Sequence, residues 1–253
     1  QEGAMIHYED KILSVNEIDA IDLVVYTPAI PSDSEQFIFF KKGSFLMMKR
    51  AEVLGRITQD YFTIAVAGTH GKTTTSSLIA HVLEESNYGG VAFLGGIASN
   101  YSSNVILNAK NNVAVVEADE FDKSFMQLSP NIIVLTSMDP DHLDVYGNQE
   151  ALKENFIAFT KTLERDDSLI IHEGIASYFK HAKVYGENDG NALKLSNVII
   201  KNGSYCFDLF YNNQLIEGFT LNYPGRHNLL NATAAIAVAL KMGISTIEIK
   251  KAL

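Results

Sequence analysis

The chain has 253 residues, of which 47% are hydrophobic, so it can bury the core of one large or two modest domains. Its formal net charge of −10 excludes the basic surface of a nucleic-acid-binding groove, and we expect no nucleic-acid partner. No apolar run approaches the roughly 20 residues of a membrane span. The single cysteine, Cys206, has no internal disulfide partner, which is typical of a protein in the reducing cytoplasm.

Residues 1–58 have the pattern of an incomplete α/β unit. Their apolar runs indicate three short strands, at 4–8, 22–26 and 45–48, followed by a helix at 49–57. The second run is apolar on both faces, as in a parallel sheet. No glycine-rich fingerprint occurs here. We expect a partial, Rossmann-like N-terminal unit that ends near Gln59-Asp60.

The next stretch joins an apolar strand, residues 61–67, to a helix through a glycine turn. The turn and the start of the helix read Gly68, Thr69, His70, Gly71, Lys72, Thr73 and Thr74. This pattern predicts a phosphate-binding loop, in which unpaired backbone N–H groups and the helix dipole face one spot. Lys72 is expected to serve the outer phosphates and Thr73 to offer a hydroxyl to Mg²⁺. Val66 replaces the first glycine of the full pattern, and the alternative is an ordinary strand-to-helix turn.

Beyond this loop, strand and helix patterns alternate, which predicts an α/β fold with a doubly wound, mostly parallel sheet. Further strands are predicted at 91–94, 113–116, 132–135, 169–171 and 183–185. Gly95-Gly96 indicates either a sharp turn or a close approach of the backbone to a ligand, and the polar stretch 100–112 indicates a loop. Helices are predicted from about 148 and over 227–242. Between these helices, Asn202-Gly203 indicates a hairpin within a small antiparallel meander, 198–221.

Two acidic clusters follow predicted parallel strands, at the sheet edge where open α/β sheets bind ligands. In Glu117-Ala118-Asp119-Glu120, Glu117 is the first polar residue after the strand, so we expect it to hold Mg²⁺. The alternative is a solvated acidic loop. In the second cluster, 139–144, His142 is a candidate for metal binding or acid–base chemistry, although imidazole is not the usual ligand of Mg²⁺. A capping loop with a surface histidine is the alternative there.

A third group lies at the start of the last long helix. His227, Asn228 and Asn231 are neighbours at one end of that helix because of their three- and four-residue spacings. Asparagine pairs with the edge of adenine and histidine stacks on a base, so these residues are candidates for adenine binding. The alternative is that Asn228 caps the helix.

Four motifs in this order resemble the Mur ligases, the ATP-dependent amide-forming enzymes of bacterial peptidoglycan synthesis. They are GTHGKTTT, VEADEFDKSF, DPDHLD and GRHNLLNATAA. The resemblance covers almost the whole chain. It implies that Lys72 and the loop amides hold the ATP phosphates, and that Thr73 and Glu117 hold Mg²⁺. It also implies that His142 serves a second Mg²⁺, and that His227, Asn228 and Asn231 hold adenine. Ser137 stands where the family usually has asparagine, which leaves that role open.

The resemblance also implies a reaction and its substrates. Within the family the motifs are most similar to those of members that join L-alanine to UDP-N-acetylmuramate through an acyl phosphate. Residues 59–253 are similar to the central ATP-binding domain of that family. The glycine-rich start of the UDP-binding domain and the C-terminal amino-acid-binding domain are missing from the sequence, so we expect a piece of a longer enzyme that is inactive alone.

Other functions stay open at this point. A murein peptide ligase or a folylpolyglutamate synthetase shares the loop. A nucleotide-binding module with a regulatory role would also contain it, but would hydrolyse ATP slowly and bind a protein partner.

Overall fold

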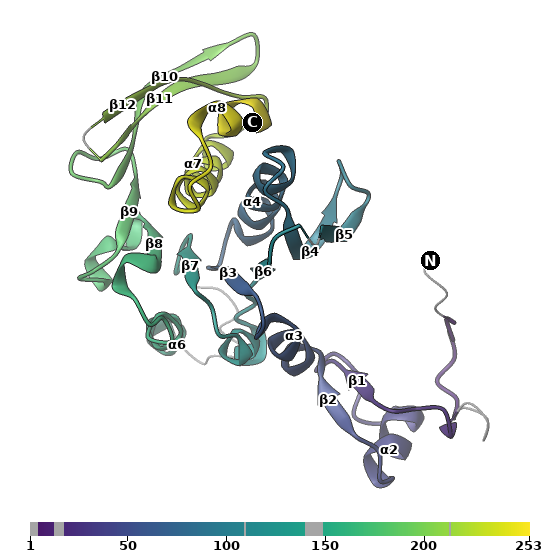
Figure 1. Ribbon diagram of the computed structural model, residues 1–253. Helices are drawn as coiled ribbons and strands as arrows, with labels where there is room; N and C mark the ends of the chain where they lie inside the picture. Colours follow the sequence, from purple (N-terminus) through teal and green to yellow (C-terminus); the bar gives the residue numbers. More distant parts are fainter. Residues whose placement is uncertain (1–4, 13–17, 109, 140–148, 213) are drawn as a thin grey trace. The chain divides into compact units, whose positions relative to one another are not determined.

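The computed structural model describes residues 5–12, 18–108, 110–139, 149–212 and 214–253 (Figure 1). The chain forms two compact units, Gln1–Ile57 and Thr58–Leu253. The phosphate-binding loop, both acidic clusters and the start of the last long helix belong to the second unit.

The first unit is a small α/β element. Its strands β1 (Val24–Tyr26) and β2 (Met47–Lys49) pair in parallel, with helix α2 (Glu35–Lys42) between them in the chain. Helix α3 (Arg50–Thr58) follows directly. The parallel pairing of β1 confirms the prediction for 22–26. The strand predicted at 4–8 is wrong for its described residues 5–8, whose exposed side chains have no sheet to pack on.

The second unit is built on one sheet. In its described part, ten strands follow the order β12-β11-β10-β9-β8-β7-β3-β6-β4-β5. The strands from β10 to β4 in this order are parallel, whereas β5, β11 and β12 are antiparallel to their neighbours. Their bounds are β3 Phe62–Ala67, β4 Gly90–Ala98, β5 Ser103–Asn108, β6 Val113–Glu117, β7 Ile132–Leu135, β8 Leu169–His172, β9 Lys183–Gly186, β10 Leu193–Lys201, β11 Ser204–Tyr211 and β12 Gln214–Leu221.

Helices cover both faces of this sheet (Figure 1). The helices and short 3-10 turns are α4 Lys72–Glu85, α6 Gln149–Thr160, α7 Arg226–Lys241, α8 Thr246–Ala252 and the turns Phe121–Gln127, Asp166–Ser168 and Glu173–Tyr178. Alternate side chains of β3, such as Ile64, share a core with Val82 of α4 and Ile236 of α7. A separate group joins Phe125 to Phe159 of α6, with ring centroids 4.6 Å apart. The predicted doubly wound, mostly parallel sheet is thus confirmed.

Three local predictions are corrected by the sheet. The stretch 100–112 contains β5, an edge strand in which Ile106 is buried between the exposed Val105 and Leu107, because pairing with β4 decides its conformation. For the same reason Gly95 and Gly96 lie inside β4, beside an irregularity in its pairing with β5, and not in a turn. The meander begins earlier than predicted, because β10 starts at Leu193 and pairs in parallel with β9.

No helix among the described residues is long and apolar enough to cross a bilayer.

Candidate nucleotide-binding site

The loop between β3 and α4 requires glycine at two positions. Gly68 and Gly71 have φ angles of 132° and 81°, which side-chain-bearing residues rarely adopt. A Cβ on Gly68 would lie 2.2 Å from Thr136 Oγ1, and one on Gly71 would lie 2.6 Å from Asn231 Oδ1. The loop is therefore closely packed against its neighbours and leads directly into α4. There the first backbone N–H groups have no partner within the helix and can bind an anion.

The end of β7 holds the loop in place. Ser137 Oγ accepts a hydrogen bond from the His70 N–H (2.9 Å) and lies 2.9 Å from Thr69 Oγ1. The Ser137 carbonyl accepts from the Thr69 N–H at 3.4 Å. The neighbouring Thr136 hydroxyl donates to the Ala67 carbonyl at 3.1 Å. The expectation of unpaired N–H groups is therefore wrong for Thr69 and His70 in this structure, because Ser137 already accepts hydrogen bonds from both.

The sequence alone did not predict the role of Ser137 in holding the loop. It could have been found from its position directly after a strand that runs parallel to β3, since the ends of such strands meet at one edge of the sheet.

Lys72 points back over the loop and meets a buried carboxylate. Its Nζ donates to the Gly68 carbonyl at 2.7 Å and lies 3.0 Å and 2.9 Å from the two carboxylate oxygens of Glu120. The side chain of Lys72 is 13% exposed and that of Glu120 is 0% exposed. Sequence reasoning did not single out Glu120, although it belongs to the acidic cluster after β6. A buried charge needs a partner, so this ion pair fixes the lysine beside the loop.

Glu117, the last residue of β6, contacts the start of α4. Its Oε1 accepts a hydrogen bond from Thr73 Oγ1 at 3.1 Å, and its Oε2 accepts from the Gly95 N–H at 2.8 Å. A Cβ on Gly95 would lie 2.4 Å from Glu117 Oε1, so the absence of a side chain there makes room for the carboxylate. Glu117 is half-buried and Thr73 exposed. A hydroxyl and a carboxylate at this spacing are oxygen ligands of the kind that Mg²⁺ prefers.

The predicted second metal ligand, His142, lies outside the described residues. Within the described ranges, no group of three or more His, Cys, Asp or Glu side chains is placed to hold a metal ion. The fit to Mg²⁺ therefore rests on Thr73 and Glu117.

The start of α7 lies next to the loop. Asn231 is buried and its amide lies against Gly71. Asn228 is also buried, and its Nδ2 donates to the Pro224 carbonyl. The alternative that Asn228 caps the helix is wrong, because the helix is capped at Gly225 without a side-chain hydrogen bond. His227 is exposed. The structure thus brings Asn231 to the loop and leaves His227 at the surface.

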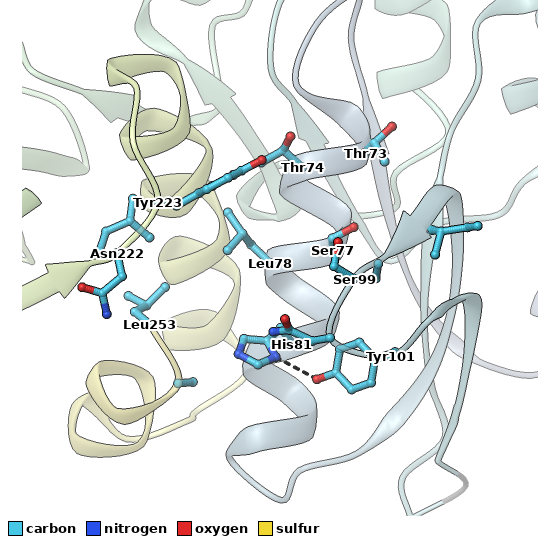
Figure 2. Close-up of a pocket in the computed structure, with 15 residues that line it drawn as sticks. Thr73, Thr74, Ser77, Leu78, His81, Ser99, Tyr101, Asn222, Tyr223 and Leu253 are labelled. Atoms are coloured by element: carbon cyan, nitrogen blue, oxygen red, sulfur yellow. Dashed lines mark hydrogen bonds between the residues drawn. The ribbon is translucent and has the colours of Figure 1, made fainter. Parts of the chain in front are cut away.

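A cavity of about 550 Å³ opens beside the first two turns of α4. Figure 2 shows its lining, to which Thr74 and Ser77 of α4 contribute together with Ser99 and Tyr223. His81 Nδ1 and Tyr101 OH are hydrogen bonded at 2.8 Å on its wall (Figure 2). Burial, with the nearby charges of Glu85 and Glu84, raises the pKa of Tyr101 to about 12. The cavity includes Thr73 and Thr74 but neither Lys72 nor Glu117, so it adjoins the phosphate loop without enclosing it.

The end of β8 adds a second polar group at the same edge of the sheet. Glu173 accepts hydrogen bonds from the Glu187 N–H (2.9 Å), the Asn188 N–H (2.8 Å) and Asn191 Nδ2 (2.6 Å). Burial raises the pKa of this carboxyl, but the hydrogen bonds outweigh burial and hold the pKa below its ordinary value of 4.5. Burial also lowers the pKa of the adjacent His172 below 6.5, against the opposing effect of Glu173.

Comparison with known proteins finds relatives of this chain. Residues 66–239 match the Mur ligase middle domain. A protein of Christiangramia forsetii named UDP-N-acetylmuramate–L-alanine ligase is 43% identical over 256 residues, which cover 100% of this chain and 56% of that protein. A protein of the same name from Flavobacterium psychrophilum is 44% identical over 255 residues, again covering 100% of this chain and 56% of the relative. The chain thus spans about half the length of the curated relatives it matches.

Solved structures share the fold. A UDP-N-acetylmuramate-alanine ligase from Thermotoga maritima superposes with a TM-score of 0.76 at 25% identity, covering 92% of this chain and 54% of that one. The UDP-N-acetylmuramate:L-alanyl-gamma-D-glutamyl-meso-diaminopimelate ligase from Neisseria meningitides gives 0.81 at 22% identity, covering 94% and 79%. The match over most of the second unit, together with relatives above 40% identity, shows that the chain belongs to the Mur ligase family.

Proposed function

We propose that the protein carrying this chain joins L-alanine to UDP-N-acetylmuramate, with ATP as the energy source and an acyl phosphate as the intermediate. The observation that carries the proposal is the start of α4, where Lys72 and Thr73 are held beside unpaired helix N–H groups. The names of the relatives at 43% and 44% identity support the two substrates. The reaction is a step of peptidoglycan synthesis.

The chemistry needs activation because a carboxylate is a poor acyl donor. Transfer of the outer phosphoryl group of ATP to the lactyl carboxylate gives an acyl phosphate, and the amine of L-alanine then displaces phosphate to form the amide. Phosphoryl transfer depends mainly on positioning and on neutralising charge. We assign to Lys72 the outer phosphates, and to the N–H groups at the start of α4 the inner ones. The N–H groups of Thr69 and His70 would bind phosphate only after breaking their hydrogen bonds to Ser137. Their side chains could bind phosphate without that change.

Thr73 and Glu117 are the residues that would hold Mg²⁺. Both supply oxygen atoms, and their 3.1 Å contact shows that they reach the same point. When bound there, the ion would neutralise charge on the phosphates. His142 is assigned to a second Mg²⁺ on the family resemblance alone.

For adenine we keep His227, Asn228 and Asn231. The closeness of Asn231 to the loop supports this assignment, since its amide lies against Gly71. The exposed His227 ring is the member best placed to stack on a base. Asn228 would first have to release the Pro224 carbonyl. We also assign residues 1–58 to the UDP-substrate-binding domain and 59–253 to the central ATP-binding domain, in agreement with the boundary between the compact units.

The test is a ligation assay with the full product of the gene that encodes this chain. The protein is supplied with Mg·ATP, UDP-N-acetylmuramate and L-alanine, and mass spectrometry follows UDP-N-acetylmuramoyl-L-alanine. We expect product in step with phosphate release, and none from Lys72→Ala. Glu217→Gln, on the exposed surface of β12, is the control variant and should remain active.

The same assay separates the alternatives. Product only when the tripeptide L-alanyl-γ-D-glutamyl-meso-diaminopimelate replaces L-alanine would identify a murein peptide ligase. Slow ATP hydrolysis that no UDP-sugar acid stimulates would favour a regulatory nucleotide-binding module.

A further inference from the structure

The carboxylate of Glu120 forms an ion pair with Lys72, the lysine that the proposed reaction needs. A protonated lysine has three N–H bonds to donate. Lys72 donates two of them to the protein, to the Gly68 carbonyl at 2.7 Å and to Glu120 Oε1 at 3.0 Å, and the second carboxylate oxygen of Glu120 lies 2.9 Å from Nζ in the same ion pair. An incoming phosphate oxygen therefore competes with the Glu120 carboxylate for the ammonium.

Burial separates this carboxylate from the metal-binding chemistry of its neighbour. The side chain of Glu120 is 0% exposed, whereas Glu117 is half-buried and faces the exposed Thr73. A cation that keeps water and phosphate ligands cannot reach a fully enclosed carboxylate. Glu120 can therefore act on a bound nucleotide only through Lys72 and through its own negative charge.

These two actions have opposite signs. The ion pair holds the lysine in one place, which favours a reaction that depends on positioning. The negative charge also competes with the outer phosphate for the ammonium and repels the phosphate in a site of low dielectric. The same residue should therefore weaken nucleotide binding and speed the transfer step.

We propose that Glu120 is a positioning residue that holds the Lys72 ammonium over the loop and gives up part of this contact to the outer phosphate of ATP. The inference rests on the proposed nucleotide site. It extends that site by a residue that touches neither metal nor substrate.

The first experiment compares the wild-type chain with Glu120→Gln, which keeps the shape of the side chain and removes its charge. Glu217→Gln is the matched control, because it makes the same change of charge on the exposed surface of β12. Calorimetry measures the Kd of a Mg-bound, non-hydrolysable ATP analogue and of AMP. For Glu120→Gln we expect the Kd of the analogue to fall about tenfold, which is 1.4 kcal/mol. AMP has no outer phosphate, so its Kd should stay the same.

Turnover supplies a second readout. In the full gene product at saturating ATP, Glu120→Gln should lower kcat about tenfold while the KM for ATP falls, because the lysine is no longer held. A merely structural role would lower the melting temperature and weaken binding, and would not tighten it. An unchanged or weaker affinity in a folded Glu120→Gln variant would overturn the inference and leave the nucleotide site intact. Absence of binding by the wild-type chain would overturn both.

A crystal structure of the wild-type chain with the Mg-bound ATP analogue tests the same point without a substitution. Lys72 Nζ should keep the Gly68 carbonyl and move from at least one oxygen of Glu120 to the outer phosphate. An ammonium that keeps both Glu120 oxygens beside bound nucleotide would contradict the proposal.

Discussion

Glu117, the last residue of β6, and Glu120 differ in environment although they lie only three residues apart. Glu120 is enclosed and paired with an ammonium, while Glu117 is half-buried and accepts hydrogen bonds from a hydroxyl and a backbone N–H. An enclosed charge is costly without its partner, so the Lys72–Glu120 pair is fixed. A partly exposed carboxylate can exchange a hydroxyl for a ligand at little cost. Burial, and not position in the chain, thus decides which glutamate keeps a fixed ion pair and which can bind a ligand.

The largest effect is expected on the enclosed side of the loop. Lys72→Ala leaves Glu120 as a buried charge without its ammonium, which should destabilise the second unit by about 3–5 kcal/mol. It should also weaken binding of Mg·ATP by about 2–3 kcal/mol, because a charge-assisted contact is lost. Urea unfolding and titration calorimetry measure the two quantities.

The double variant Lys72→Ala/Glu120→Gln sharpens this prediction. Removing the second charge should restore much of the stability but not the affinity for ATP. A double variant less stable than Lys72→Ala would show that Glu120 has enough other partners to remain charged without the lysine.

A smaller effect is expected on the open side, from a matched pair of glycines. Gly95→Ala places a Cβ 2.4 Å from Glu117 Oε1, whereas Gly96→Ala places one 3.3 Å from Thr73 Cγ2. The carboxylate can swing away, so Gly95→Ala should cost little stability. It should raise the Mg²⁺ concentration needed for half-maximal ATP binding about tenfold, because the displaced Glu117 carboxylate no longer supports the metal site. Gly96→Ala should change this concentration far less. Equal effects of the two variants would remove Glu117 from the metal site.

Ser137 tests how firmly the loop itself is held. Ser137→Ala removes the hydroxyl that accepts from the His70 N–H at 2.9 Å. The expected cost is about 1 kcal/mol of stability, the usual net value of one hydrogen bond. Ser129→Ala, on an exposed side chain, is the control. If ATP binding becomes tighter in Ser137→Ala, the freed loop amides contact phosphate, and if it weakens, Ser137 holds the loop in its binding conformation. Unchanged stability would contradict the bracing role.

The smallest effect concerns Glu173, which is fixed by N–H groups and not by an ammonium. Its pKa is lowered in the folded state, so the stability it contributes is present above its ordinary pKa of 4.5 and is lost as the pH falls through the folded value. The unfolding free energies of wild type and Glu173→Gln should therefore differ more at pH 7 than at pH 3. Glu164→Gln, an exposed charge, is the control. A difference that does not change with pH would show that Glu173 acts by shape alone.

The sequence alone was sufficient for features that local chemistry determines. The apolar run of β3, the glycines of the loop and the helical spacing after them predicted strand, turn and helix, and the structure confirms all three. These elements follow from backbone sterics and from a repeating pattern of burial, which are properties of neighbouring residues. The four motifs also predicted the family that the comparisons show.

Tertiary structure decided the features that depend on distant segments. Residues 103–108, within the stretch 100–112 that was predicted to be a loop, form β5 by pairing with the edge of β4. Glu120 met Lys72, and Ser137 met His70, across separations of 48 and 67 residues. The sequence named the acidic cluster but could not tell which carboxylate would be enclosed. Burial depends on how the whole sheet and its helices pack, and that packing gave Glu117 and Glu120 their different environments.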